Sequence, residues 1–129
     1  MPYLIAKILK SFTYAIAGII SGCTERNMRV HCVATVLVVF LGFLFQISQS
    51  EWLWVLLMIG LVLAAELMNT AVEEMCNSMR DELGLPYASS KRPRDLAAGA
   101  VLVLAILAAV SGYIIFMPKV WLMFGMIIK

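Results

Sequence analysis

The chain has 129 residues, of which 63% are apolar and only 14% are charged. A water-soluble domain of this length has about half apolar residues and nearer a quarter charged ones. The surplus apolar surface excludes an ordinary soluble domain and indicates a membrane protein, and the length is that of one domain, 1–129. The net charge of +2 gives no indication of nucleic-acid binding.

The basic residues are placed unevenly along the chain. Most lie in the N-terminal part or between the second and third apolar runs, and only Lys119 and Lys129 follow the third run. Membrane-protein loops rich in Lys and Arg stay on the cytoplasmic side. We therefore expect the N-terminal segment and the 80–95 loop to be cytoplasmic, in a multi-pass protein of the bacterial inner membrane.

Residues 4–22 predict an amphipathic helix on the membrane surface. At 100° per residue, Leu4 and Ile8 fall on an apolar half of the helical wheel and Lys7 falls on the polar half. A basic face opposite an apolar one is typical of a helix that lies in the plane of the interface. The same division argues against a lipoprotein signal peptide ending at Cys23, because the apolar core of a signal is apolar on every side.

Three spanning helices are expected to follow, in an all-α membrane protein. Each is long enough for a bilayer, which needs about 20 residues. Their predicted ranges are 29–47, 52–80 and 95–117. Gly84 marks the end of the second helix, and Pro118 is expected to stop the third because proline lacks the N–H that continues a helix. The basic segment 89–93 predicts a cytosolic loop, and the apolar tail 120–129, too short to span, predicts an interfacial segment.

A polar stripe runs along the second spanning helix. Its members are spaced at i, i+3, i+4, i+7 and i+11, which places them on one helix face. They are Glu66, Asn69, Thr70, Glu73 and Asn77. At 1.5 Å per residue, Glu66 lies roughly 21 Å inward from Trp52. In a hydrocarbon core of about 30 Å, this leaves Glu66 in the inner leaflet and Glu73 near the cytosolic boundary.

An acid at this depth marks a functional site by default, because its insertion costs about 3 kcal/mol. The alternative is a polar seam that sets helix packing through interhelical hydrogen bonds. Such a seam needs one or two amides rather than two glutamates. We therefore favour a functional site along the stripe.

The arrangement suits transfer of a phosphoryl group to a hydroxyl in the membrane. Phosphoryl transfer needs metal ions that bridge the phosphates, cations that offset the developing charge, and a base for the attacking hydroxyl. Glu25 and Glu73 are candidate Mg²⁺ ligands, since Mg²⁺ prefers one or two carboxylates plus phosphate oxygens. Arg92 and Arg94 are candidate cations. The sequence has no glycine-rich P-loop or kinase loop, so the nucleotide site is expected to be of an unusual kind.

Two strings in these regions resemble a known family. They are Glu66-Leu-Met-Asn-Thr-Ala-Val-Glu73 and Arg94-Asp95-Leu-Ala-Ala-Gly-Ala-Val-Leu102, and both resemble the prokaryotic diacylglycerol kinases, which include the undecaprenol kinases of Gram-positive bacteria. The likeness extends to Lys10-Ser-Phe, to Thr24-Glu-Arg-Asn27 and to the layout of three spans after an amphipathic leader, over about residues 4–118. It implies a homotrimeric helical bundle with composite active sites, using ATP as co-substrate and Mg²⁺.

The resemblance also implies roles for individual residues. Glu66 matches the proposed catalytic base and Asn69 the neighbouring orienting amide, while Glu25 and Glu73 match metal-binding glutamates. The residues that match the nucleotide site are Tyr14, Asn77, Arg92, Arg94 and Asp95. Two of these depart from the family pattern. Asn77 stands where the family usually has aspartate, and Arg94 replaces the usual lysine, which keeps the charge but changes the donor geometry.

The stripe itself gives a second reason to expect an oligomer. Three helices of one small chain cannot surround a polar face of five residues, so we expect a neighbouring protomer to cover it. Small residues such as Ala97 and Gly99 allow close approach of helices at that depth.

The predicted function is an ATP-dependent lipid kinase with an active site that faces the cytoplasm. The segments 24–27, 97–100 and 117–119 look closer to the undecaprenol kinase branch, so undecaprenol is the first substrate predicted and diacylglycerol the second. The alternative, left open by the two departures, is a non-catalytic membrane oligomer or a small exporter subunit.

Overall fold

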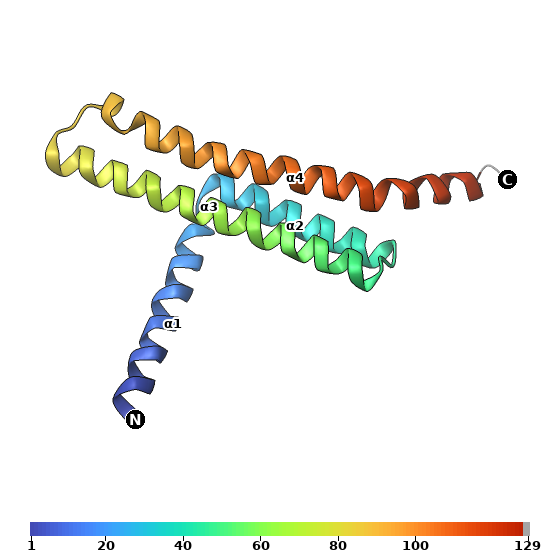
Figure 1. The fold of residues 1–129 in the computed structure, drawn as a ribbon, viewed down its shortest axis with the longest axis horizontal. Coiled ribbons are helices and arrows are strands. Elements are labelled where there is room, and N and C mark those ends of the chain that lie inside the picture. The colour runs from blue at the N-terminus through green and yellow to red at the C-terminus, as the bar shows by residue number, and fades with distance from the viewer. Residues whose placement is uncertain (128–129) are drawn as a thin grey trace.

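The structure is a computed structural model of the chain, and it describes residues 1–127. These residues form four helices: α1 (Pro2–Gly22), α2 (Arg26–Leu44), α3 (Gln49–Leu83) and α4 (Tyr87–Ile127). Helices α2, α3 and α4 lie side by side in a bundle, whereas α1 projects away from it (Figure 1). The predicted all-α fold is confirmed.

All four helices are long enough and apolar enough to cross a membrane. Large apolar side chains are exposed along the whole bundle, among them Phe40, Leu53 and Ile106. Lipid is the solvent that accommodates such a surface, so the chain is a membrane protein, as predicted. Because α1 also meets the length and composition of a span, its place on the membrane surface and the arrangement of three spans plus one surface helix stay predictions.

The sequence explains where α3 begins and ends. Ser48 precedes the helix, and its side chain and backbone N–H form a capping box with the backbone and carboxylate of Glu51. At the other end Gly84 has a left-handed φ of 65°, which glycine adopts without strain from a Cβ. The predicted end at Gly84 is confirmed, and α3 extends to Leu83 rather than to 80.

Helix α2 lies a few residues earlier in the chain than the predicted range 29–47. Glu25 has an extended backbone and caps the start of the helix, ahead of the first continuous apolar residues that the prediction used. Gly42 on α2 leaves room for the aromatic ring of Trp52 on α3. A Cβ at Gly42 would lie 2.7 Å from the ring of Trp52, so α2 and α3 meet closely at this end.

Helix α4 is much longer than the predicted range 95–117. The predicted loop at 89–93 is wrong, since the helix begins at Tyr87, and the predicted stop at Pro118 is wrong, since it continues to Ile127. A proline removes one backbone hydrogen bond, and neighbouring side chains can satisfy the freed groups. The carbonyl that Pro118 leaves without its helix donor is that of Ile114, and the Lys119 ammonium donates to the next carbonyl, that of Ile115, at 3.2 Å. The predicted interfacial tail therefore continues α4, except that its last two residues lie outside the described residues.

Helix α3 packs on α4 along a seven-residue repeat. Four of its buried side chains, those of Val55, Val62, Asn69 and Cys76, are spaced seven residues apart. Helix α4 has Val101 and Ile115 buried in turn. A seven-residue repeat keeps one side of a helix facing its partner over many turns. The seam is apolar in one half and polar in the other.

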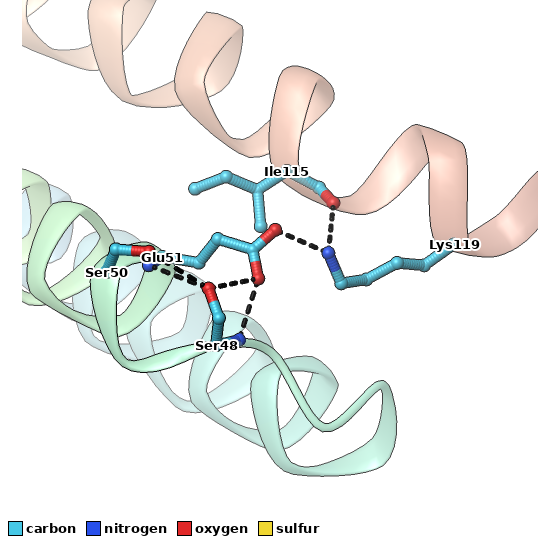
Figure 2. Close-up of polar contacts among 5 residues, drawn as sticks. All are labelled: Ser48, Ser50, Glu51, Ile115 and Lys119. Atoms are coloured by element: carbon cyan, nitrogen blue, oxygen red, sulfur yellow. Dashed lines mark hydrogen bonds and ion pairs between the residues drawn. The ribbon is translucent and has the colours of Figure 1, made fainter.

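Polar contacts join α3 and α4 near both ends of this seam. At one end the Lys119 ammonium reaches across to the Glu51 carboxylate at 2.5 Å, as Figure 2 shows. At the other end Nη2 of Arg94 donates to Oδ1 of Asn77 at 2.9 Å. The two contacts fix the antiparallel register of the pair.

Candidate active site

Glu66 and Asn69 are buried within the single chain, with 2% and 3% of their surface exposed. Counting equal numbers of residues inward from the two end contacts places Glu66 at the level of Leu104 or Ala105 of α4, and the bond between Asn77 and Arg94 shows that one end of the stripe faces α4. Glu66 and Asn69 are thus covered within one chain, whereas Thr70, Glu73 and Asn77 stay half-buried, so the expectation that a neighbouring protomer covers the stripe remains a prediction. Asn69 also belongs to the seven-residue repeat of α3, so part of the stripe is the packing seam that was weighed as the alternative to a functional site.

Asn69 and Glu73 are hydrogen-bonded along α3. Nδ2 of Asn69 donates to Oε1 of Glu73 at 3.3 Å, while Oδ1 of Asn69 is buried and has no partner among residues 1–127. An unsatisfied buried acceptor costs about 1–3 kcal/mol, so such an atom calls for a ligand or another explanation. The pair presents hard oxygen donors at the half-buried part of the stripe.

Arg94 is held between α3 and the start of α4. Besides its bond to Asn77, its guanidinium lies over the ring of Tyr87, 5.4 Å from the centroid. Its Nε is buried and makes no hydrogen bond within the described part of the chain. The two residues that depart from the family pattern are thus direct partners. Because Asn77 is neutral, it orients Arg94 without cancelling its charge.

The other predicted site residues are distributed around this centre. Asp95 is paired with Lys91 one turn earlier on α4. Arg92 is exposed on α4. Tyr14 is exposed on α1, where the Lys10 ammonium lies 5.8 Å from its ring centroid, and Glu25 is exposed at the start of α2. Among the described residues, no hydrogen bond or ion pair joins Tyr14 or Glu25 to the α3–α4 site.

The donor set around Glu73 fits a magnesium ion that shares its ligands with phosphate groups. Within residues 1–127 no three His, Cys, Asp or Glu side chains come together as a complete metal site. Mg²⁺ bound to a nucleotide needs only one or two carboxylates. The half-buried Glu73 carboxylate meets that requirement on α3, and no hydrogen bond or ion pair within residues 1–127 joins it to Glu25.

Two neighbours of the predicted site residues, Lys91 and Tyr87, were missed from the sequence. Lys91 lies four residues before the predicted Asp95, a spacing that brings side chains together on a helix, but a loop had been predicted at 89–93. Tyr87 is seven residues before Arg94 and therefore shares its face of α4. Both signals become visible only once the helix is known to begin at Tyr87.

Comparison with known proteins agrees with the resemblance. Residues 13–116 match the family model for prokaryotic diacylglycerol kinase. The chain is 38% identical over 114 residues to the undecaprenol kinase of Bacillus subtilis (strain 168), covering 88% of this chain and 90% of that protein. It is 34% identical over 113 residues to a diacylglycerol kinase of Synechocystis sp. (strain ATCC 27184 / PCC 6803 / Kazusa), covering 86% of this chain and 63% of that protein. No solved structure gives a significant match. The chain therefore belongs to the prokaryotic diacylglycerol kinase family, and is a lipid kinase that transfers a phosphoryl group to an alcohol, as predicted.

Proposed function

We propose that this lipid kinase phosphorylates undecaprenol, using ATP and Mg²⁺ on the cytosolic side of a bacterial inner membrane. The relative named undecaprenol kinase is matched over 90% of its length, whereas the relative named diacylglycerol kinase is matched over 63%. Diacylglycerol is the second candidate, favoured by the description of the family model.

The burial of Glu66 is the observation on which the proposed mechanism rests. A carboxylate with 2% of its surface exposed, at a depth in the inner leaflet, is placed to accept a proton from a hydroxyl that stays in the membrane. In the proposed step the lipid oxygen attacks the γ-phosphorus of ATP and the bond from that phosphorus to the β-phosphate oxygen breaks. The hydroxyl proton passes to Glu66 and ADP leaves. Asn69, one turn further along α3, orients the reacting groups.

The phosphate side of the reaction is assigned to the cytosolic half of the seam. Arg94, oriented by the neutral Asn77, contacts the phosphates of the nucleotide, and the exposed Arg92 supplies a second cation. Glu73 and Glu25 would hold the Mg²⁺, which would neutralise phosphate charge when bound. The remaining assignments to the nucleotide site are Asp95 and Tyr14.

We infer that the active enzyme is a homotrimer with composite sites. Among residues 1–127 no hydrogen bond or ion pair joins Tyr14 or Glu25 to the α3–α4 site, and α1 projects away from the bundle beyond its C-terminal end, where Gly22 packs on Leu67 (Figure 1). A neighbouring protomer that presents its α1 and the turn after it would bring both residues to the site. This reason for the trimer is separate from the expectation that a neighbouring protomer covers the half-buried part of the stripe.

A direct assay of the two lipids tests the substrate. Purified protein in mixed micelles is given ATP and Mg²⁺ with either undecaprenol or diacylglycerol, and kcat/KM is measured for each. We expect undecaprenol to be preferred at least tenfold. Preference for diacylglycerol would contradict the substrate assignment, and ATP consumption without phosphorylation of any lipid alcohol would contradict the proposed reaction.

A further inference from the structure

A groove lies deeper in the bundle than the proposed catalytic groups. It is enclosed by α2, α3 and α4 and has a volume of about 420 Å³, within the range of ligand sites. On α3 its wall runs from Val55 to Val62, and on α4 it runs from Ala105 to Gly112. The lining is almost entirely apolar, with His31 as the only ionisable side chain among the described residues that form it.

The groove continues the line of the active site into the membrane. Val62, at one end of its α3 wall, is four residues from Glu66, or about 6 Å along the helix axis. Val55, at the other end, is about 16 Å from Glu66 in the direction away from Glu73 and the nucleotide side. The proposed catalytic groups lie on the polar half of the α3 seam and the groove lies along its apolar half. The two sites are therefore neighbours along α3.

We propose that this groove binds the hydrocarbon chain of the lipid alcohol whose hydroxyl meets Glu66, an inference that rests on the proposed function. A lipid alcohol has no large headgroup beyond its hydroxyl, so a hydroxyl at the depth of Glu66 requires the chain to lie deeper still. The groove begins at that point and extends in that direction. Its apolar lining matches a hydrocarbon, and because the chain only exchanges one apolar surrounding for another, the groove selects a long chain through van der Waals packing along its length.

Gly112 provides a way to fill the groove without distorting the helix. A Cβ at Gly112 meets no atom within 4 Å, so Gly112→Leu adds its side chain to open space in the groove. Gly60 on α3 also has nothing within 4 Å of a Cβ but does not line the groove, so Gly60→Leu is the matched control. Full-length wild type and both variants are compared for kcat/KM with undecaprenol and with an alcohol of only two isoprene units.

We expect Gly112→Leu to lower kcat/KM about tenfold for undecaprenol and less than twofold for the short alcohol, which ends before the deep part of the groove. Gly60→Leu should leave the ratio between the two alcohols unchanged. Equal losses with both alcohols, or no loss with either, would overturn the proposal. Loss of the oligomer in Gly112→Leu, measured by native mass, would show instead that the groove receives a helix of a second copy.

A binding measurement separates this proposal from the proposed reaction. A long prenyl alcohol with a diazirine at its chain end is photolysed with each protein, and the labelled peptides are identified by mass spectrometry. We expect labelling of the groove walls of α2, α3 and α4 in wild type and Gly60→Leu, and much less in Gly112→Leu, whether or not the lipid is phosphorylated. Labelling confined to other surfaces would overturn the groove even if wild-type turnover confirms the kinase reaction.

Discussion

Arg94 lies between two partners of different kinds, the amide of Asn77 and the ring of Tyr87. Neither partner bears a negative charge. The guanidinium is therefore oriented while its charge remains available to a phosphate. From the sequence, Asn77 and Arg94 were two separate departures from the family pattern. Their contact makes them one coupled pair, since an asparagine acceptor suits the fork of an arginine.

A charge introduced at Asn77 tests this coupling. In Asn77→Asp the new carboxylate forms an ion pair with Arg94 that ATP must break, at a cost of about 1 kcal/mol, so we expect the KM for ATP to rise about fivefold. The double variant Asn77→Asp with Arg94→Lys should return to within about twofold of wild type, because the shorter reach of lysine weakens the pair. Strictly additive effects in the double variant would contradict the coupling.

Glu66 is the residue whose loss should separate chemistry from nucleotide binding. Gln at this position keeps the shape of the side chain but cannot accept the hydroxyl proton. We expect Glu66→Gln to lower turnover by a factor of about 10² to 10⁴ and to leave ATP binding unchanged, since Glu66 lies about 10 Å along α3 from Glu73. Glu74→Gln, an exposed glutamate of the same helix, is the control. Turnover above roughly a tenth of wild type in Glu66→Gln would exclude Glu66 as the base.

The two proposed metal ligands make a further prediction. Glu25→Gln and Glu73→Gln each remove a negative charge that would bind Mg²⁺, so we expect the Mg²⁺ concentration for half-maximal turnover to rise about tenfold or more in each variant. Glu82→Gln, near the end of α3, should leave it unchanged. An unchanged Mg²⁺ dependence in both variants would be incompatible with the assignment.

At the scale of helices, the spacing of the stripe predicted its common face, and the bond between Asn77 and Arg94 places one end of that face against α4. The length of α4 could not be predicted in the same way. Pro93 and Pro118 indicate helix ends in a sequence, whereas in the structure α4 continues past both, and after the second of them Lys119 is held by Glu51 of α3 and by the Ile115 carbonyl. Because the third spanning helix was predicted to begin at residue 95 rather than at Tyr87, Tyr87 was not recognised as a neighbour of Arg94.

The contact of Lys119 with Glu51 predicts the stability of this end of the bundle. Lys119→Met removes an ion pair that is mostly buried, together with the bond to the Ile115 carbonyl. We expect a loss of about 1 kcal/mol in stability, seen as a fall of roughly 3–5 °C in the Tm in detergent. Lys7→Met, the same change on the exposed face of α1, should have no effect on the Tm. Equal Tm values for wild type and Lys119→Met would show that the pair does not stabilise the register.

At the scale of the whole molecule, the basic residues predict which end of the bundle faces the cytosol. Gln49 and Ser89 are exposed near opposite ends of α3 and α4, and Gln49 is a better probe than Ser48, which caps α3. In a background without the native cysteines, Gln49→Cys should react with an impermeant thiol reagent added outside intact cells, and Ser89→Cys only after lysis. The reverse pattern would place the proposed nucleotide site on the outer side.

From the sequence alone we could predict the all-helical fold, the membrane class and the family, because each depends on composition or on spacing within one helix. The relation between helices was not accessible in this way. The burial of Glu66 within one chain depends on how the helices pack, α4 continues through two prolines that predict helix ends, and the direction of α1 away from the bundle is visible only in three dimensions.

The burial of Glu66 has a consequence for the release of product. The substrate hydroxyl is neutral and can enter a site with almost no access to water, whereas the product is a phosphate ester with about two negative charges beside an acid. A charged group at that depth is strongly disfavoured relative to water. On the proposed mechanism the reaction therefore creates the driving force that expels its own product towards the cytosolic interface, and the same depth keeps an already phosphorylated lipid from entering the site and competing with the neutral alcohol.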